Sequence, residues 1–117
     1  MIHPVLLSLS SADLGTTCMP SPPEHCSVVV TATIGRPGEA SGDNFSFLVA
    51  TPSALAQAEG GRWGRGILIV ESFSWDGVER AVRNLLAHSA RETWLEVAQA
   101  LNRELLWEYD GYRPFDG

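Results

Sequence analysis

The fold is decided by two nearby stretches of the chain, CSVVVTATI at residues 26–34 and FSFLVA at residues 45–50. In the first stretch β-branched residues dominate and every second residue is apolar, which favours a strand with one buried face. In the second stretch every second residue is again large and apolar. Residues 35–44 between them are mostly polar and contain Pro and Gly, as a hairpin connection does. We therefore predict an antiparallel hairpin built from these two strands.

Three further segments have the alternation that is typical of strands. Val5, Leu7 and Leu9 share one face of a predicted first strand. The apolar run at residues 67–73 predicts a later strand, and the alternation over residues 105–110 predicts a short last one.

Three helices are predicted from their start signals. Thr51 before Pro52 is typical of a helix N-terminus, so a short helix is expected over residues 53–58. Two longer helices are expected where residue pairs have the three-residue spacing of a capping box. These pairs are Asp76 with Glu79, and Thr93 with Glu96. The apolar stripes of the two longer helices consist of Val78, Val82, Leu85 and Leu86, and of Trp94, Val97, Ala98 and Leu101.

The predicted order of elements is β-β-β-α-β-α-α-β. Strands joined by hairpins favour a largely antiparallel sheet, so the fold class is α+β, with about four to five strands and the helices packed on one face. A length of 117 residues is that of one domain, and we expect residues 1–117 to form it.

The charge of the chain restricts its partners. Fourteen acidic residues stand against eight basic ones, all of them Arg, and the net charge is −6. Nucleic acid and anionic membranes repel such a surface, so neither is expected as a partner, whereas a basic protein is. The N-terminus lacks the positive charge and cleavage site of a signal peptide, which predicts a cytoplasmic protein with Cys18 and Cys26 as thiols.

Candidate catalytic residues do not form a recognisable set. His25 and Cys26 are adjacent, but with Cys18 they lack the paired spacing of zinc ligands, and no nucleophile motif accompanies them. The Gly-rich loop at residues 60–66 precedes a strand instead of opening a helix, so it is not a phosphate-binding loop. We predict no catalytic residue, no metal, no cofactor and no enzymatic activity. Trp63, in this loop, is either packed in the core or displayed at an interface.

The C-terminal part of the chain has the composition of a binding surface. From Glu92 onward there are six acidic residues and two Arg. On a last strand Trp107 and Tyr109 would face the core, and Glu108 and Asp110 would project outward together. Aromatic residues anchor interfaces, and carboxylates attract a basic partner. The predicted partner-binding residues are Glu108, Asp110, Tyr112 and Trp63.

Taken in order, several segments resemble the immunity protein 8 family of bacterial polymorphic-toxin and contact-dependent inhibition systems. These segments are FSFLVATP at 45–52, Trp63, GILIV at 66–70, TWLEVA at 93–98 and WEYDGY at 107–112. The resemblance spans nearly the whole chain from residue 26.

The resemblance implies a function in binding, without catalysis or a cofactor. Proteins of this family are expected to protect a bacterium by binding the C-terminal domain of a toxin. The matching residues are mostly packing residues, so the resemblance assigns no contacts, and Gly111 stands where the family commonly has an acidic residue. Two alternatives remain open: an adaptor or secretion chaperone, and a small-molecule-binding domain or enzyme with a cleft around Trp63 and His25.

Overall fold

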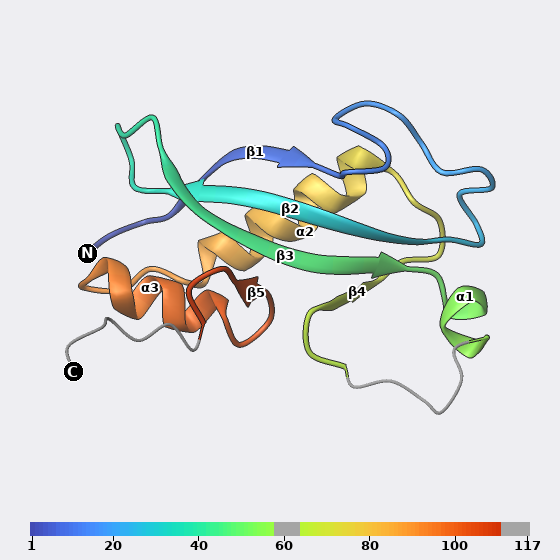
Figure 1. The fold of residues 1–117 in the computed structure, drawn as a ribbon. Helices are drawn as coiled ribbons and strands as arrows, with labels where there is room; N and C mark the ends of the chain where they lie inside the picture. The colour runs from blue at the N-terminus through green and yellow to red at the C-terminus, as the bar shows by residue number, and fades with distance from the viewer. Residues whose placement is uncertain (58–63, 111–117) are drawn as a thin grey trace, which may run out of the picture.

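The computed structural model describes residues 1–57 and 64–110 as one sheet with three helices (Figure 1). The elements in chain order are β1 Val5–Ser10, β2 Ser27–Gly35, β3 Gly42–Ala50, α1 Pro52–Ala56, β4 Ile67–Ile69, α2 Trp75–Ala87, α3 Trp94–Leu101 and β5 Leu106–Trp107. The α+β class with a mostly antiparallel sheet is therefore confirmed.

The sheet is organised around β3. On one side β2 pairs with β3 in an antiparallel register that runs from Ser27 opposite Ala50 to Gly35 opposite Gly42. On the other side two short strands share the edge of β3. Parallel β4 lies beside its C-terminal half, and antiparallel β5 pairs with Phe45 and Ser46 near its start. The outermost strand on the β2 side is β1.

The core forms between one face of the sheet and two of the helices. The inward residues of the hairpin are Val28, Val30, Ala32, Ile34, Phe45, Phe47 and Val49, and all are buried. From α2 and α3 come Val78, Val82, Leu86, Val97, Ala98 and Leu101. Figure 1 shows α2 lying across this face, with α3 and β5 next to each other near the start of β3. By contrast α1 contributes no buried residue, so the predicted packing of helices on one face holds for α2 and α3.

Val5, Leu7 and Leu9 do not share one face of β1 as predicted. The register between β1 and β2 shifts between Leu6 and Ser8, which is a β-bulge. Because of this shift Leu6 and Leu9 pack against the core, whereas Leu7 lies outward and is 37% exposed. A strict alternation cannot anticipate such an extra residue.

The predicted bounds of the later strand and of α2 were also wrong. The strand expected over residues 67–73 ends at Ile69, because its partner β3 ends at the paired residue Ala50 and the chain then turns into α1. Phe73 is nevertheless buried, in the loop before α2. The N-cap of α2 is Ser74, whose Oγ accepts a hydrogen bond from the backbone N of Gly77 at 3.0 Å.

Asp76 and Glu79 therefore lie inside α2 instead of capping it. Glu79 pairs with Arg83 one turn later, at 3.1 Å between Oε2 and Nε. The first helix begins at Pro52 as its start signal indicates, but the Thr51 hydroxyl bonds to the backbone of Cys26 instead of capping the helix.

The capping box of α3 is confirmed. Thr93 Oγ1 accepts a hydrogen bond from the backbone N of Glu96 at 3.2 Å, and the Glu96 carboxylate accepts one from the backbone N of Thr93 at 3.2 Å.

Replacing Thr93 with Ala should therefore lower the free energy of unfolding by about 1 kcal/mol, the usual cost of losing an N-cap side chain. Urea denaturation followed by circular dichroism measures this difference. Glu92→Ala, an exposed change at the preceding residue, is the control and should have almost no effect. Equal stability of the Thr93→Ala and Glu92→Ala variants would contradict the assigned cap.

None of the helices in residues 1–57 and 64–110 combines the length and the apolar character that a bilayer-spanning helix requires.

Candidate functional site

The C-terminal surface predicted from the sequence is built around a strand that is shorter than expected. Trp107 faces the core, where its ring stacks on Phe45 with centroids 6.4 Å apart. The strand ends there, and residues 108–110 form a turn in which the backbone N of Asp110 donates to the carbonyl of Trp107 at 3.0 Å. Tyr109 consequently lies edge-on against Trp107 and is 46% exposed, so its predicted inward position was wrong.

Glu108 and Asp110 are exposed, but each carboxylate has a partner within the molecule. The Glu108 carboxylate accepts a hydrogen bond from the backbone N of Asn44, at the start of β3. The Asp110 carboxylate lies 3.4 Å from a guanidinium nitrogen of Arg65, and both side chains are about half exposed. Glu108 and Asp110 do not project together from a strand as predicted, because β5 ends at Trp107, before both of them. Trp63 and Tyr112 lie outside the described residues.

Arg65 connects the segment before β4 to the end of α3. Its Nε donates to the carbonyl of Asn102 at 2.9 Å, and its Nη2 donates to the side-chain oxygen of Asn102 at 2.6 Å. A cation at a helix C-terminus is favoured by the helix dipole. The same Asn102 oxygen accepts from the backbone N of Trp107 at 3.0 Å. This contact orients the C-terminal surface, and no local pattern around Arg65 indicates it.

Asp43 joins three elements beside this surface. One of its carboxylate oxygens accepts hydrogen bonds from two indole nitrogens, those of Trp94 and Trp107, each at 3.0 Å. The guanidinium of Arg36 lies over the Trp94 ring, 5.8 Å from its centroid. Trp94, which opens the apolar stripe of α3, is therefore only partly buried, with its polar edge bound to β3.

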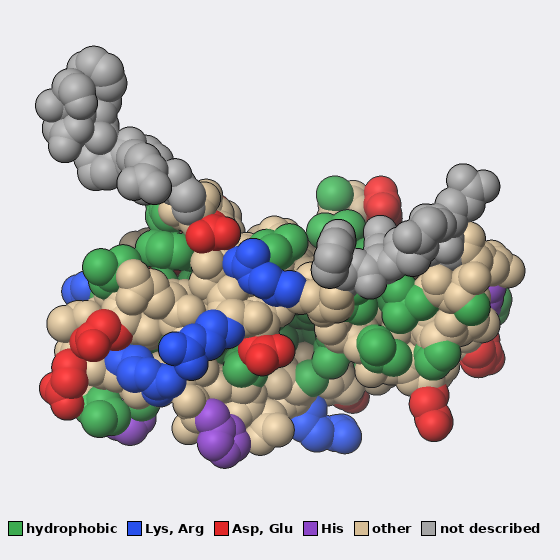
Figure 2. Space-filling model, turned by 90° about the horizontal axis from the view of Figure 1, so that it is seen from below, with side chains coloured by type: hydrophobic (Ala, Val, Ile, Leu, Met, Phe, Trp, Pro, Cys, Tyr) green, Lys and Arg blue, Asp and Glu red, His purple; other side chains and the backbone are tan. Residues whose placement is uncertain are grey.

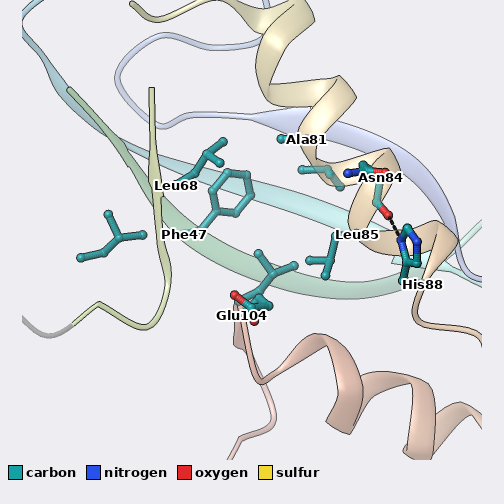
Figure 3. A pocket seen from close by; sticks show the side chains of 10 residues that line it. Phe47, Leu68, Ala81, Asn84, Leu85, His88 and Glu104 are labelled. Carbon is teal, nitrogen blue, oxygen red and sulfur yellow. Dashed lines mark hydrogen bonds between the residues drawn. The ribbon is translucent and has the colours of Figure 1, made fainter. Parts of the chain in front are cut away.

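A groove of about 330 Å³ opens between α2 and the turn that links α3 to β5 (Figure 3). Phe47 and Leu68 of the sheet lie at its base, and Ala81 and Leu85 of α2 form one apolar wall. Figure 2 shows this side of the molecule, with hydrophobic side chains lying between acidic and basic ones. No pattern in the sequence indicates this groove, because it lies where two helices leave part of the sheet uncovered.

The candidate catalytic groups do not assemble into a reactive centre. His25 Nδ1 lies 2.8 Å from Ser53 Oγ, but both are exposed, and in the described part of the chain no carboxylate bonds to the His25 ring. Burial raises the pKa of the Cys26 thiol, and the neighbouring charge of Glu24 raises it further. A raised pKa disfavours the thiolate, which is the nucleophilic form. Among the described residues no three His, Cys, Asp or Glu side chains are grouped as metal ligands.

Comparison with known families identifies the class of protein. The model of the family described as immunity protein 8 matches residues 6–112, which is nearly the whole chain. The chain therefore belongs to the immunity protein 8 family. No curated protein and no solved structure matches it.

Proposed function

We propose that this protein binds the C-terminal domain of a cognate bacterial toxin and neutralises it, as a stoichiometric complex in the cytoplasm. The observation that carries this proposal is the membership of the immunity protein 8 family over residues 6–112. Neutralisation by binding needs neither turnover nor a cofactor, so the protein is proposed not to be an enzyme.

The charge of the chain supports a basic toxin domain. With a net charge of −6, the protein attracts a positively charged surface and accelerates encounter with it. A nuclease carries such a surface for the phosphates of its substrate. An acidic protein can occupy that surface and exclude the nucleic acid.

The proposed contact surface includes Glu108 and Asp110 on the turn after β5, with Tyr109 exposed between them. The Asp110–Arg65 pair is half exposed, and ion pairs of this kind contribute little to stability. Asp110 can therefore exchange Arg65 for a cation of the partner at small cost. Trp63 and Tyr112 remain proposed contacts on the basis of the sequence.

Neutralisation of the toxin is tested by measuring the growth of bacteria that express it. Co-expression of this protein with its cognate toxin should restore growth of a sensitive strain, whereas an adaptor or secretion chaperone would bind without restoring it. Purified protein should form a complex with the isolated toxin C-terminal domain in equal stoichiometry. Absence of both rescue and complex formation would overturn the proposal.

The contact surface is tested by charge reversal. The Glu108→Arg, Asp110→Arg double variant should associate with the toxin domain about tenfold more slowly at low salt, and its association should depend less on salt. The matched control is Glu24→Arg, Glu71→Arg, which changes the net charge equally. Both control residues lie near Ala50, about 20 Å along β3 from Asn44. If the two double variants associate at the same rate, the contact lies elsewhere.

Folding of the charge variants is checked by circular dichroism and melting. Because Asp110→Arg places a second cation beside Arg65, the neutral Glu108→Gln, Asp110→Asn variant provides a milder version of the same test. It should slow association less than the double reversal, in the same direction.

A further inference from the structure

We propose that the groove between α2 and the α3–β5 turn receives a large apolar side chain of the toxin domain, and that an adjacent Lys or Arg of the toxin pairs with Glu104. This inference rests on the proposed function. The proposed occupant is defined by its chemistry, and no pattern in the sequence indicates its site.

The apolar stripe of α2 is wider than its set of fully buried residues. Its core-facing residues are Val78, Val82 and Leu86, and all three are buried. Ala81 and Leu85, four residues apart, continue the apolar stripe to the edge of the core, where Leu85 packs against it, and both side chains are only partly buried. They form a wall of the groove, one helical turn apart on the same side of α2.

The shape of the groove is suited to one large side chain. The ring of Phe47 closes its base and is almost completely buried, while Leu68 of β4 lies beside it. A volume of about 330 Å³ is at the lower end of the range for sites that enclose small ligands. It is suited to one large aromatic or aliphatic side chain, the kind of anchor on which protein interfaces depend most.

The rim of the groove carries the negative charge of Glu104. Glu104 lies across the groove from Asn84 and His88 (Figure 3), and it is the only formally charged carboxylate or guanidinium among the described lining residues. Its carboxylate makes no hydrogen bond or ion pair with the described part of the chain. Its backbone is held from two sides, since its N donates to the carbonyl of Leu101 at 3.1 Å and its carbonyl accepts from Gly66 at 3.0 Å. Within the described residues the Glu104 carboxylate is therefore unpaired, and it extends from a backbone that is held in place.

Several carboxylates of β3, α3 and the turn after β5 already have partners. Those of Asp43, Glu96, Glu108 and Asp110 accept hydrogen bonds or pair with Arg. The opposite rim presents a neutral carboxamide and an imidazole whose orientation is fixed by the contact of His88 Nδ1 with the carbonyl of Asn84 at 2.9 Å. The complementary ligand is therefore apolar at its tip and cationic beside it.

This charge distribution selects between possible occupants. A second copy of the chain would bring another surface of net charge −6 against Glu104, which is unfavourable. A basic toxin domain supplies the missing cation. The segment from Glu104 to Asp110 also connects the groove with the C-terminal surface, so that one partner can contact both.

The proposal is tested with a substitution that fills the groove. Ala81→Phe places a ring where the anchor would bind, and the probe is the purified C-terminal domain of the cognate toxin, made catalytically inactive. We expect its dissociation from Ala81→Phe to be at least about tenfold faster than from the native protein, the effect of losing one strong anchor. Ala87→Phe is the matched control. It introduces the same ring at an exposed position on the same helix, about 240° around it, and should change dissociation less than about twofold.

A second variant tests the charge without altering packing. Glu104 is exposed, so Glu104→Arg should fold normally and should slow association about tenfold at low salt. Glu24→Arg, remote from the groove, is its control. If Ala81→Phe fails to fold, Glu104→Arg decides the question.

The outcomes separate this inference from the proposed function. If the native protein neither binds nor neutralises the toxin, the proposed function fails. If it does both, and the Ala81→Phe and Glu104→Arg variants bind as tightly as their controls, the function stands and the groove is not its anchor site. Native mass spectrometry that finds a small molecule bound to the purified protein and lost from Ala81→Phe, with unchanged toxin affinity, would also overturn the inference.

Discussion

Replacing Asp43 with Ala is expected to lower the free energy of unfolding by about 2–4 kcal/mol. One carboxylate oxygen of Asp43 accepts both the Trp94 and the Trp107 indole N–H, each at 3.0 Å and in a partly buried setting. A hydrogen bond to a charged group contributes about 1.5–3 kcal/mol, and removal of the acceptor leaves both donors without it. The substitution thus loosens α3 and β5 from β3 at once.

Urea denaturation measures the loss, with two control variants. Asp43→Asn keeps one side-chain oxygen as acceptor but removes the charge, so it should cost less than half as much. Glu39→Ala removes the carboxylate of an exposed pair with Arg36, in the same hairpin, and should cost less than about 0.5 kcal/mol. Should Asp43→Ala prove as mild as Glu39→Ala, the double indole contact does not stabilise the protein.

The second large effect is expected for Phe45→Ala, at about 3–5 kcal/mol, the usual cost of truncating a buried Phe. Phe45 is completely buried, and its ring stacks at 14° on that of Trp107 across the β3–β5 pairing. Removing it leaves a cavity beneath the only aromatic side chain of β5. The loss therefore combines transfer of the ring to water with weaker docking of β5.

The control for this substitution is Val29→Ala. Val29 lies on the opposite face of β2 and is 57% exposed, so its truncation should cost less than about 1 kcal/mol. A difference of at least about 2 kcal/mol between Phe45→Ala and Val29→Ala is expected. Similar losses would contradict the placement of the core on the Phe45 face of the sheet.

The parts of the fold that could be predicted are those with a strong local signal. The alternation over residues 26–34 and 45–50 predicts the central hairpin, and the Thr93–Glu96 spacing predicts the start of α3; the structure confirms both. Wrong bounds arose where a tertiary contact ends an element. The clearest case is β4, which stops at Ile69 because β3 offers no further partner. The bulge in β1 and the cap at Ser74 are local features that neither the alternation nor the Asp76–Glu79 spacing indicates.

The candidate site was less predictable because its contacts join distant parts of the chain. Asp43 and Trp107 are 64 residues apart, and Arg65 and Asp110 are 45 apart. No periodicity or motif contains information about such pairs. The sequence could indicate that the end of the chain is acidic and aromatic, but only the fold determines which carboxylates are already paired. The groove likewise depends on the relative placement of two helices.

The shared edge of β3 has a consequence for the order in which the molecule opens. The hairpin of β2 and β3 closes a short loop, whereas the pairing of Phe45 with Trp107 closes one of about 60 residues, with a larger entropic cost. With only two residues in its ladder, β5 should open at a lower free energy than the hairpin, which hydrogen exchange of its amides would report. If the toxin domain binds the turn after β5 in its closed form alone, as the proposed contact surface implies, it should slow that exchange, and more so the tighter it binds.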